Sequence, residues 1–318
     1  MIAYHAGLFP KGHYGVSLFF AISGFLITTL LLRERERSGT VSLRGFYVRR
    51  VLRIFPLYYA VLLLYVVLTL FVEGDPVRET EFFRNLPFFL TYTSNWFVDL
   101  HGSRVIFYFA WSLATEEQFY AAWPWVMRQA RTWRLPVATM AGLMAVGQGI
   151  DWAASRGLID GEHLYARILG SIQSPICLGC LAALALHLKE GFAWGWPLLG
   201  QRWSALAWAA AAGASLVFPV PEFLLFVALA GWVASCAVQA HSWASPVLEN
   251  KGLRYLGTIS YGMYLLHMIA LNLARRVFSP ESTWACLVGA LALSVALASL
   301  SHRFIERPFL ALKERYQA

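Results

Sequence analysis

Long apolar segments alternate with short polar loops from one end of the chain to the other. A bilayer core of about 30 Å needs roughly 20 apolar residues in each helix that crosses it. A segment at 82–98 is a doubtful span, because Arg84, Asn85 and Pro87 interrupt its aromatic residues. The pattern therefore predicts an all-α, polytopic transmembrane bundle of about nine to ten spans, with candidates at 15–32, 55–72, 107–127, 134–152, 168–187, 203–219, 223–240, 255–275 and 283–301.

The charges of the loops predict the direction of each span, since cytoplasmic loops collect Lys and Arg. The loop after the first span is the most basic and is expected inside, whereas the mostly acidic loop 73–81 is expected outside. Only one crossing fits before the next basic loop, 128–134, so 82–98 should lie at the outer face or dip in and return. The same alternation places the basic C-terminal tail in the cytoplasm. Arg275 and Arg276 fall outside and break the rule.

Composition agrees with this pattern. Hydrophobic residues make up 58% and charged residues 14% of the 318 positions, against about 45–50% and about 25% in soluble domains. These values exclude a water-soluble enzyme with one core, a disordered chain and a disulfide scaffold. The loops leave no room for a soluble domain, so we expect a single integral-membrane domain over 1–318.

The net charge of +8 comes almost entirely from arginine, because only four of the 26 cations are lysine. Membrane orientation explains most of this excess. Arginine also holds phosphate through a planar, bidentate fork, which lysine cannot do.

Two cysteines, Cys177 and Cys180, form a C-x-x-C inside an apolar run. Redox pairs of this spacing normally lie next to a strand. We therefore favour buried thiols over a redox or metal site.

Polar groups inside spans are costly, about 2.5–3.5 kcal/mol each, and are functional candidates by default. His5 precedes the first span, and its side chain type suits proton transfer near neutral pH; a headgroup-region histidine is the alternative. Ser23 and Gly24 in that span could serve only close helix packing.

A basic motif enters the second span. If it is helical, Arg50 and Arg53 share a face while Arg49 points elsewhere. The cluster fits a phosphorylated ligand at the cytoplasmic mouth, with simple anchoring as the alternative.

Two further motifs place polar groups in spans. Glu116 and Glu117 fall in the middle of 107–127, where a structural salt bridge is the alternative to a catalytic role. Ser260, Tyr264 and His267 predict one polar stripe on 255–275, and Pro308 after the last span would end a helix.

Five segments, in this order, closely resemble the membrane acyltransferase-3 family: HYGVSLFFAISGFLI, FYVRRVLRIFPLYY, WSLATEEQFYAAWP, LGTISYGMYLLH and FIERP. The resemblance runs from His5 to Pro308. It implies a bundle of about ten helices in the bacterial inner membrane. It also implies transfer of an acyl group, often acetyl, from cytoplasmic acyl-CoA to a hydroxyl of an extracytoplasmic glycan or lipid-linked sugar.

The resemblance also assigns roles to matching positions. We expect partners to be membrane lipid and the glycan acceptor, not nucleic acid; the oligomeric state stays open. No metal is expected. The resemblance implies His5 and Glu116 as catalytic residues, Arg50 and Arg53 as donor-binding residues, and a matching element from Ser260 to His267. Our own hypothesis adds Arg49 to the donor site and makes Trp111, Tyr120, Tyr264 and His267 the substrate-binding residues.

One departure from the family keeps alternatives open. The family's first helix precedes the histidine and carries an arginine, whereas this chain starts four residues before His5. The loop charges independently predict a span before His5, because they place the N-terminus outside. We therefore expect most of that first helix to be missing. An inactive, truncated member and a flippase for a lipid-linked sugar are the alternatives, although no repeat typical of transporters is visible.

Overall fold

The computed structural model describes residues 1–100, 105–278 and 283–314, and every regular element in these ranges is helical. The predicted all-α class is confirmed. The chain divides into two compact units, Met1–Gly15 with Arg44–Gly74 and Pro246–Ala318, and Val16–Leu43 with Asp75–Ser245. A single domain over 1–318 stays a prediction.

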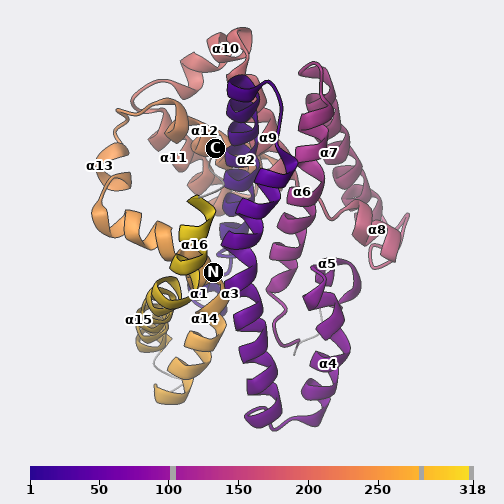
Figure 1. Ribbon diagram of the computed structural model, residues 1–318, viewed down its shortest axis with the longest axis vertical. Coiled ribbons are helices and arrows are strands. Elements are labelled where there is room, and N and C mark those ends of the chain that lie inside the picture. The colour runs from indigo at the N-terminus through magenta and orange to yellow at the C-terminus, as the bar shows by residue number, and fades with distance from the viewer. Residues whose placement is uncertain (101–104, 279–282, 315–318) are drawn as a thin grey trace. The chain divides into compact units, whose positions relative to one another are not determined.

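The helices are assigned to the unit that holds most of their residues (Figure 1). The first unit contains α1 (Ile2–His5), α3 (Leu43–Phe71), α13 (Ser245–Leu248), α14 (Lys251–Val277), α15 (Thr283–Ser301), the π-helix η1 (His302–Glu306) and α16 (Arg307–Glu314). The second contains α2 (Tyr14–Ser38), α4 (Pro76–Leu90), α5 (Ser94–Phe97), α6 (Ala110–Gln129), α7 (Arg134–Ser155), α8 (Leu164–Leu169), α9 (Ser174–His187), α10 (Lys189–Leu199), α11 (Ser204–Val217) and α12 (Glu222–Val238).

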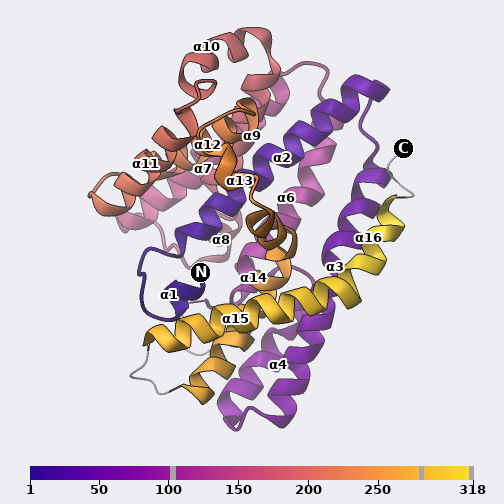
Figure 2. The same cartoon turned by 90° about the vertical axis from the view of Figure 1, so that its left-hand side faces the viewer.

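In the first unit, α14 and α15 pack against one another along their lengths (Figure 2). Gly262 allows the close approach, since a Cβ atom there would lie 2.9 Å from Ser301 Oγ and 3.2 Å from Ala298 Cβ. The other end of this pair supports α1. Ile2 and Ala6 pack on a buried cluster formed by Leu271, Ala274, Cys286 and Ala290.

In the second unit, α2 lies beside α6 and α9 (Figure 1). Gly24 of α2 and Gly179 of α9 meet backbone to backbone. A Cβ atom on Gly24 would lie 2.2 Å from the Ile176 carbonyl oxygen, and one on Gly179 would lie 2.2 Å from that of Ala21. Small residues thus set this helix crossing, as the sequence suggested for Gly24.

The cysteines lie at the same crossing. Cys177 and Cys180 are free and fully buried, and Cys180 Sγ lies 3.5 Å from the Gly24 carbonyl oxygen. The expectation of buried thiols is confirmed.

Five helical segments are long and apolar enough to cross a membrane, within the described part of the chain: Pro10–Ser38, Leu43–Phe71, Leu164–His187, Lys251–Val277 and Thr283–Leu312. The helices α11 and α12 are apolar but shorter. Large apolar side chains such as Leu63 and Val288, each 63% exposed, cover these helices. Such surfaces indicate an integral membrane protein.

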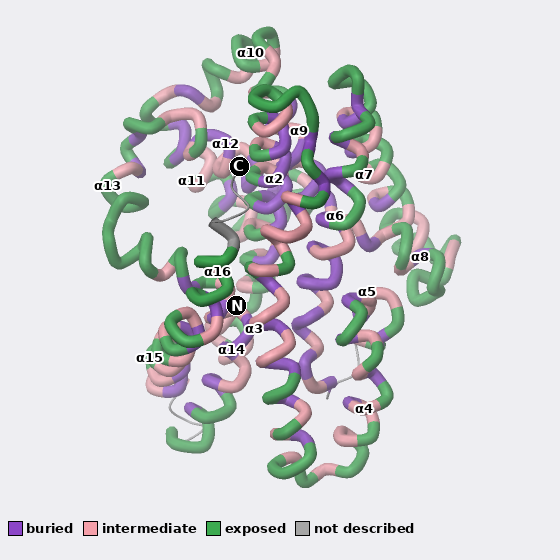
Figure 3. The backbone as a smooth tube through the Cα atoms, in the orientation of Figure 1, coloured by how far each residue is buried: buried purple, intermediate pink, exposed green. Residues whose placement is uncertain are grey.

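Two predicted spans, 107–127 and 134–152, correspond to α6 and α7 but do not meet that criterion of length and hydropathy. In α6 the reason is visible in the burial pattern: this helix is largely buried by protein (Figure 3). It can therefore carry polar groups such as Glu116.

Other boundaries differ from the prediction. The second span begins at Leu43 instead of 55, because the basic motif continues the helix. The doubtful segment 82–98 is the pair α4 and α5, and α4 is capped by Asp75, whose carboxylate accepts from Val77 N at 3.0 Å.

The stretch from Lys189 to Arg202 was expected to be a loop, but most of it forms the helix α10. This helix is largely exposed (Figure 3), and Trp194 is 84% exposed. Its glycines and proline among aromatic residues weaken the helix pattern in the sequence, and exposed tryptophans are typical of a membrane interface.

Candidate functional site

His5 is the last residue of α1 and is half-buried in the first unit. Its ring centroid lies 5.2 Å from that of His267, with the planes tilted by 31°, and the Tyr4 ring packs edge-on at 4.9 Å. Nη2 of Arg275 donates a 2.6 Å hydrogen bond to the His5 carbonyl oxygen. The packing of α1 on α14 thus brings together two histidines that lie at opposite ends of the sequence.

The electrostatics of this pair keep His5 uncharged. Burial, then the terminal ammonium group and Arg275, lower the pKa of His5 from 6.5 to about 4. A neutral imidazole is the form that a general base requires. The low pKa also makes it a weaker base than an exposed histidine.

His267 is buried, and its Nδ1 lies 2.5 Å from the Tyr264 carbonyl oxygen one turn earlier. A carbonyl only accepts, so the neutral ring carries its proton on Nδ1 and its lone pair on Nε2. The Tyr264 ring lies 5.6 Å away. Ser260 does not take part, because it is exposed and its hydroxyl donates to the Gly257 carbonyl oxygen.

The arginine motif lies in the first turns of α3, in the same unit as His5. Arg49 and Arg50 are half-buried and Arg53 is exposed. The Arg50 guanidinium stacks 5.6 Å from the Phe46 ring centroid. Directly after the motif, the Tyr261 hydroxyl donates to the Ile54 carbonyl oxygen at 2.8 Å and fixes α14 to α3.

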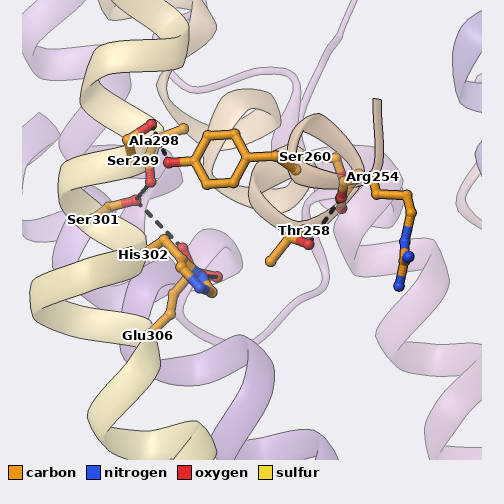
Figure 4. Close-up of polar contacts among 10 residues, drawn as sticks. Arg254, Thr258, Ser260, Ala298, Ser299, Ser301, His302 and Glu306 are labelled. Atoms are coloured by element: carbon orange, nitrogen blue, oxygen red, sulfur yellow. Dashed lines mark hydrogen bonds and ion pairs between the residues drawn. The ribbon is translucent and has the colours of Figure 1, made fainter. Parts of the chain in front are cut away.

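The tail motif places a buried carboxylate near these arginines. Figure 4 shows Ser301, His302 and Glu306 gathered around the π-helix. Ser301 Oγ donates to Glu306 Oε1 at 3.4 Å, and His302 Nδ1 lies 3.7 Å from Glu306 Oε2. Arg53 also interacts electrostatically with Glu306.

The structural alternative for the tail motif, a helix stop at Pro308, is wrong. Here η1 runs directly into α16, and Pro308 is its second residue.

Glu116 is buried at the centre of the second unit, at 4% exposure. The hydroxyls of Ser23 and Tyr120 both donate to its Oε1, and they also lie 3.3 Å from one another. One turn along, Trp123 Nε1 donates to Thr28 Oγ1 at 2.9 Å. These bonds join α6 to α2 and satisfy a carboxyl group that would otherwise be costly to bury.

Trp111 lies on another part of α6, with its ring edge-on to Phe20 at 6.0 Å. Nearby, Asn95 and Gln118 exchange two side-chain hydrogen bonds of 2.9 and 2.8 Å, and Asn95 Nδ2 also donates to Thr115 Oγ1 at 3.2 Å. Asn95 of the segment 82–98 therefore binds α6.

The predicted site residues fall into two groups, one in each unit. The first unit holds His5, Arg49, Arg50, Arg53, Tyr264 and His267, and the second holds Trp111, Glu116 and Tyr120.

Two residues in the site were missed by sequence reasoning. Arg275 stood out in the sequence only because it breaks the positive-inside rule. That violation was the one sequence feature that could have indicated its place in the site. Glu306 lies in the tail motif, but nothing in the sequence pointed to its interaction with Arg53. In the described ranges, no group of three or more His, Cys, Asp or Glu side chains is arranged to hold a metal ion.

Comparison with known proteins supports the reading of these motifs. The sequence profile described as "Acyltransferase domain" (Acyl_transf_3) matches residues 4–303. The peptidoglycan O-acetyltransferase OatA of Listeria monocytogenes is 30% identical, over 97% of this chain and 53% of its own length. The Bacillus subtilis protein named "Putative peptidoglycan O-acetyltransferase YrhL" is 28% identical, over 93% of this chain and 50% of its own length.

The chain thus spans about half the length of these curated relatives. No solved structure matches it significantly. The profile covers nearly all of the sequence and includes every predicted site residue, and on that evidence the chain belongs to the acyltransferase-3 family.

Proposed function

We propose that this protein is a membrane O-acyltransferase that moves an acetyl group from cytoplasmic acyl-CoA to a hydroxyl of an extracytoplasmic cell-wall glycan. Family membership and the names of the relatives support this activity. The observation that carries the proposal is the neutral, half-buried His5 beside His267, in the same unit as the arginine motif.

His5 is the proposed general base. As the acceptor hydroxyl attacks the thioester carbonyl carbon, its proton passes to the imidazole and a C–O bond forms. The tetrahedral adduct collapses, the C–S bond breaks, and the leaving thiolate takes a proton from the imidazolium. The products are the glycan ester and free CoA, and His5 returns to its neutral form. Such catalysis contributes roughly 10²–10⁴-fold.

The arginine motif suits the donor. Acyl-CoA carries a diphosphate and a further phosphate, and three guanidinium groups at the start of one helix supply bidentate donors and positive charge. We assign Arg50 and Arg53 to these phosphates and Arg49 to a supporting role. With this assignment the donor would bind at the cytoplasmic side, in the orientation that the loop charges predict.

The remaining site residues receive supporting roles. Glu116 is the proposed catalytic carboxylate of the second unit, held by Ser23 and Tyr120. Tyr264 and His267 would line the path to His5. The protein would reside in the bacterial inner membrane, surrounded by lipid, with its C-terminus in the cytoplasm.

The test uses the full chain in proteoliposomes, with radiolabelled acetyl-CoA and glycan fragments released from cell walls by a muramidase. We expect CoA release that depends on the glycan. His5→Ala should lower turnover roughly 10²–10⁴-fold, while His241→Ala, at an exposed histidine, should not. Unchanged turnover in His5→Ala would overturn the base assignment, and wild-type protein that releases no CoA would favour a flippase or an inactive member.

The donor site has its own test. Arg50→Gln and Arg53→Gln should each raise the KM for acetyl-CoA about tenfold or more, because hydrogen bonds to charged groups contribute about 1.5–3 kcal/mol. Arg44→Gln is the matched control, since Arg44 is an exposed arginine at the start of the same helix. Equal effects in all three variants would reduce the motif to membrane anchoring.

A further inference from the structure

The second unit contains a pocket of about 310 Å³. Among its lining residues, Trp111 is the one already predicted to bind substrate. Its walls come from α5, α6, α7 and the segment around α8. The side chains that matter for binding are Asn95, Trp111, Asp151, Glu162, Arg167 and Gln173. The volume is at the lower end of the roughly 300–1,000 Å³ of small-molecule sites, so the pocket fits a small ring system rather than a long chain.

The walls are held in place before any ligand binds. Thr115 accepts from Asn95, which is locked in its paired bonds with Gln118. Arg167 Nη2 donates to the carbonyl oxygens of Asn95, at 3.4 Å, and Val98. These bonds tie α5 and α8 to α6. The side chains of the walls are therefore already ordered, which lowers the entropy cost of binding a ligand.

The chemistry of the lining favours a sugar. Trp111 is only half-buried and offers an apolar aromatic surface next to polar side chains. Asp151 and Glu162 are exposed carboxylates that accept from hydroxyl groups, and Gln173 can both donate and accept. This combination matches a sugar ring, which has an apolar C–H face and a rim of hydroxyls.

The charge of the lining excludes the phosphates of the donor from this pocket. Two carboxylates and one guanidinium line the pocket, and that guanidinium already donates to two backbone carbonyls. A formally acidic lining repels a phosphate and tolerates a neutral polyol.

The pocket lining and the proposed catalytic carboxylate share the helix α6. Trp111 and Thr115 are four residues apart on α6, and Thr115 directly precedes Glu116. We infer that this pocket binds one sugar unit of the acceptor glycan and sets specificity for it. The inference rests on the proposed O-acetyl transfer and adds the acceptor-binding site to it.

Kinetics of the full chain in proteoliposomes test the pocket, with acetyl-CoA and a muramyl disaccharide as the probe. Trp111→Ala removes the aromatic surface and should raise the KM for the disaccharide about tenfold. Ala154→Phe fills the pocket from α7 and should raise it at least as much. Both should leave the KM for acetyl-CoA unchanged. The matched control is Trp125→Ala, at an exposed tryptophan of the same helix outside the pocket.

An unchanged KM for the disaccharide in both pocket variants would overturn the inference. So would an equal rise in both KM values, because the effect would then not be specific to the acceptor. Saturation-transfer NMR can measure binding of the disaccharide to the detergent-purified chain without any acyl transfer. This measurement separates failure of the pocket inference from failure of the proposed function. Suppose that the wild-type protein transfers no acetyl group. If it still binds the disaccharide and Ala154→Phe does not, the pocket is supported. If both proteins bind it, or if the wild type does not, the inference is overturned.

Discussion

Nη2 of Arg275, near the end of α14, donates a 2.6 Å hydrogen bond to the carbonyl oxygen of His5. The bond joins α1 to α14 at the point where the two histidine rings meet. It holds the short helix that carries the proposed base, and it places a permanent positive charge near the imidazole. Arg275 thus both positions His5 and disfavours its protonation.

The pH dependence of acyl transfer should reflect this charge. His5 acts as a base only when neutral, so protonation below its pKa of about 4 should abolish activity, and the acidic limb of the profile should lie near pH 4 rather than 6.5. Arg275→Gln removes one of the interactions that lower this pKa, so the limb should move to higher pH, although burial keeps it below 6.5. The measurement is kcat/KM against pH. Arg276→Gln is the control, and identical profiles for the two variants would contradict the prediction.

Glu306 should affect the donor and not the acceptor. It is a buried carboxylate that interacts with Arg53, whose side chain is exposed. Pairs with an exposed partner contribute about 0.2–1 kcal/mol, so Glu306→Gln should raise the KM for acetyl-CoA by a factor of about 1.4 to 5. The KM for the glycan should stay constant. Glu249→Gln, at an exposed carboxylate of the same unit, should change neither value; a rise in the glycan KM for Glu306→Gln would show a different role.

Variants of Glu116 should separate its structural and chemical roles. Glu116→Gln keeps an oxygen that can accept from Ser23 and Tyr120, so its thermal unfolding in detergent should stay close to that of the wild type. Glu116→Ala leaves both hydroxyls without this acceptor and should cost about 1–3 kcal/mol. Tyr120→Phe should fall between them. If transfer decreases in Glu116→Gln while stability does not, the carboxylate has a chemical role; loss of both together would reduce it to a packing group.

Much of the fold was predictable from hydropathy, for a physical reason. Helices that expose apolar surface to lipid must be apolar along their whole length, and α2, α14 and α15 agree with their predicted spans to within a few residues at most boundaries. Hydropathy predicts helix boundaries less accurately where a helix is surrounded by protein instead of lipid. The α6 helix is buried by protein and carries polar side chains, and the start of α3 is basic.

The candidate site was predictable residue by residue but not in its contacts. Motif resemblance pointed to His5 and His267, and these two rings do lie together. The interactions of Arg275 with His5 and of Arg53 with Glu306 depend on how separate helices pack. Neither has a signature in local spacing, so only the structure could supply them.

The crossing of α2 and α9 should be the most sensitive packing position in the second unit. The Cβ atom of Gly24→Ala would meet the backbone oxygen of Ile176 at 2.2 Å, and backbone cannot move aside as a flexible side chain can. Overpacking of this kind costs about 1–3 kcal/mol, and the shift would also disturb Ser23, which donates to Glu116. We therefore expect lower thermal stability and lower acyl transfer together.

Gly213→Ala is the matched control on α11, because nothing lies within 4 Å of its Cβ position; there alanine should stabilise the helix by about 0.5–1 kcal/mol. Equal stability of the two variants would show that the glycine contact does not determine this crossing.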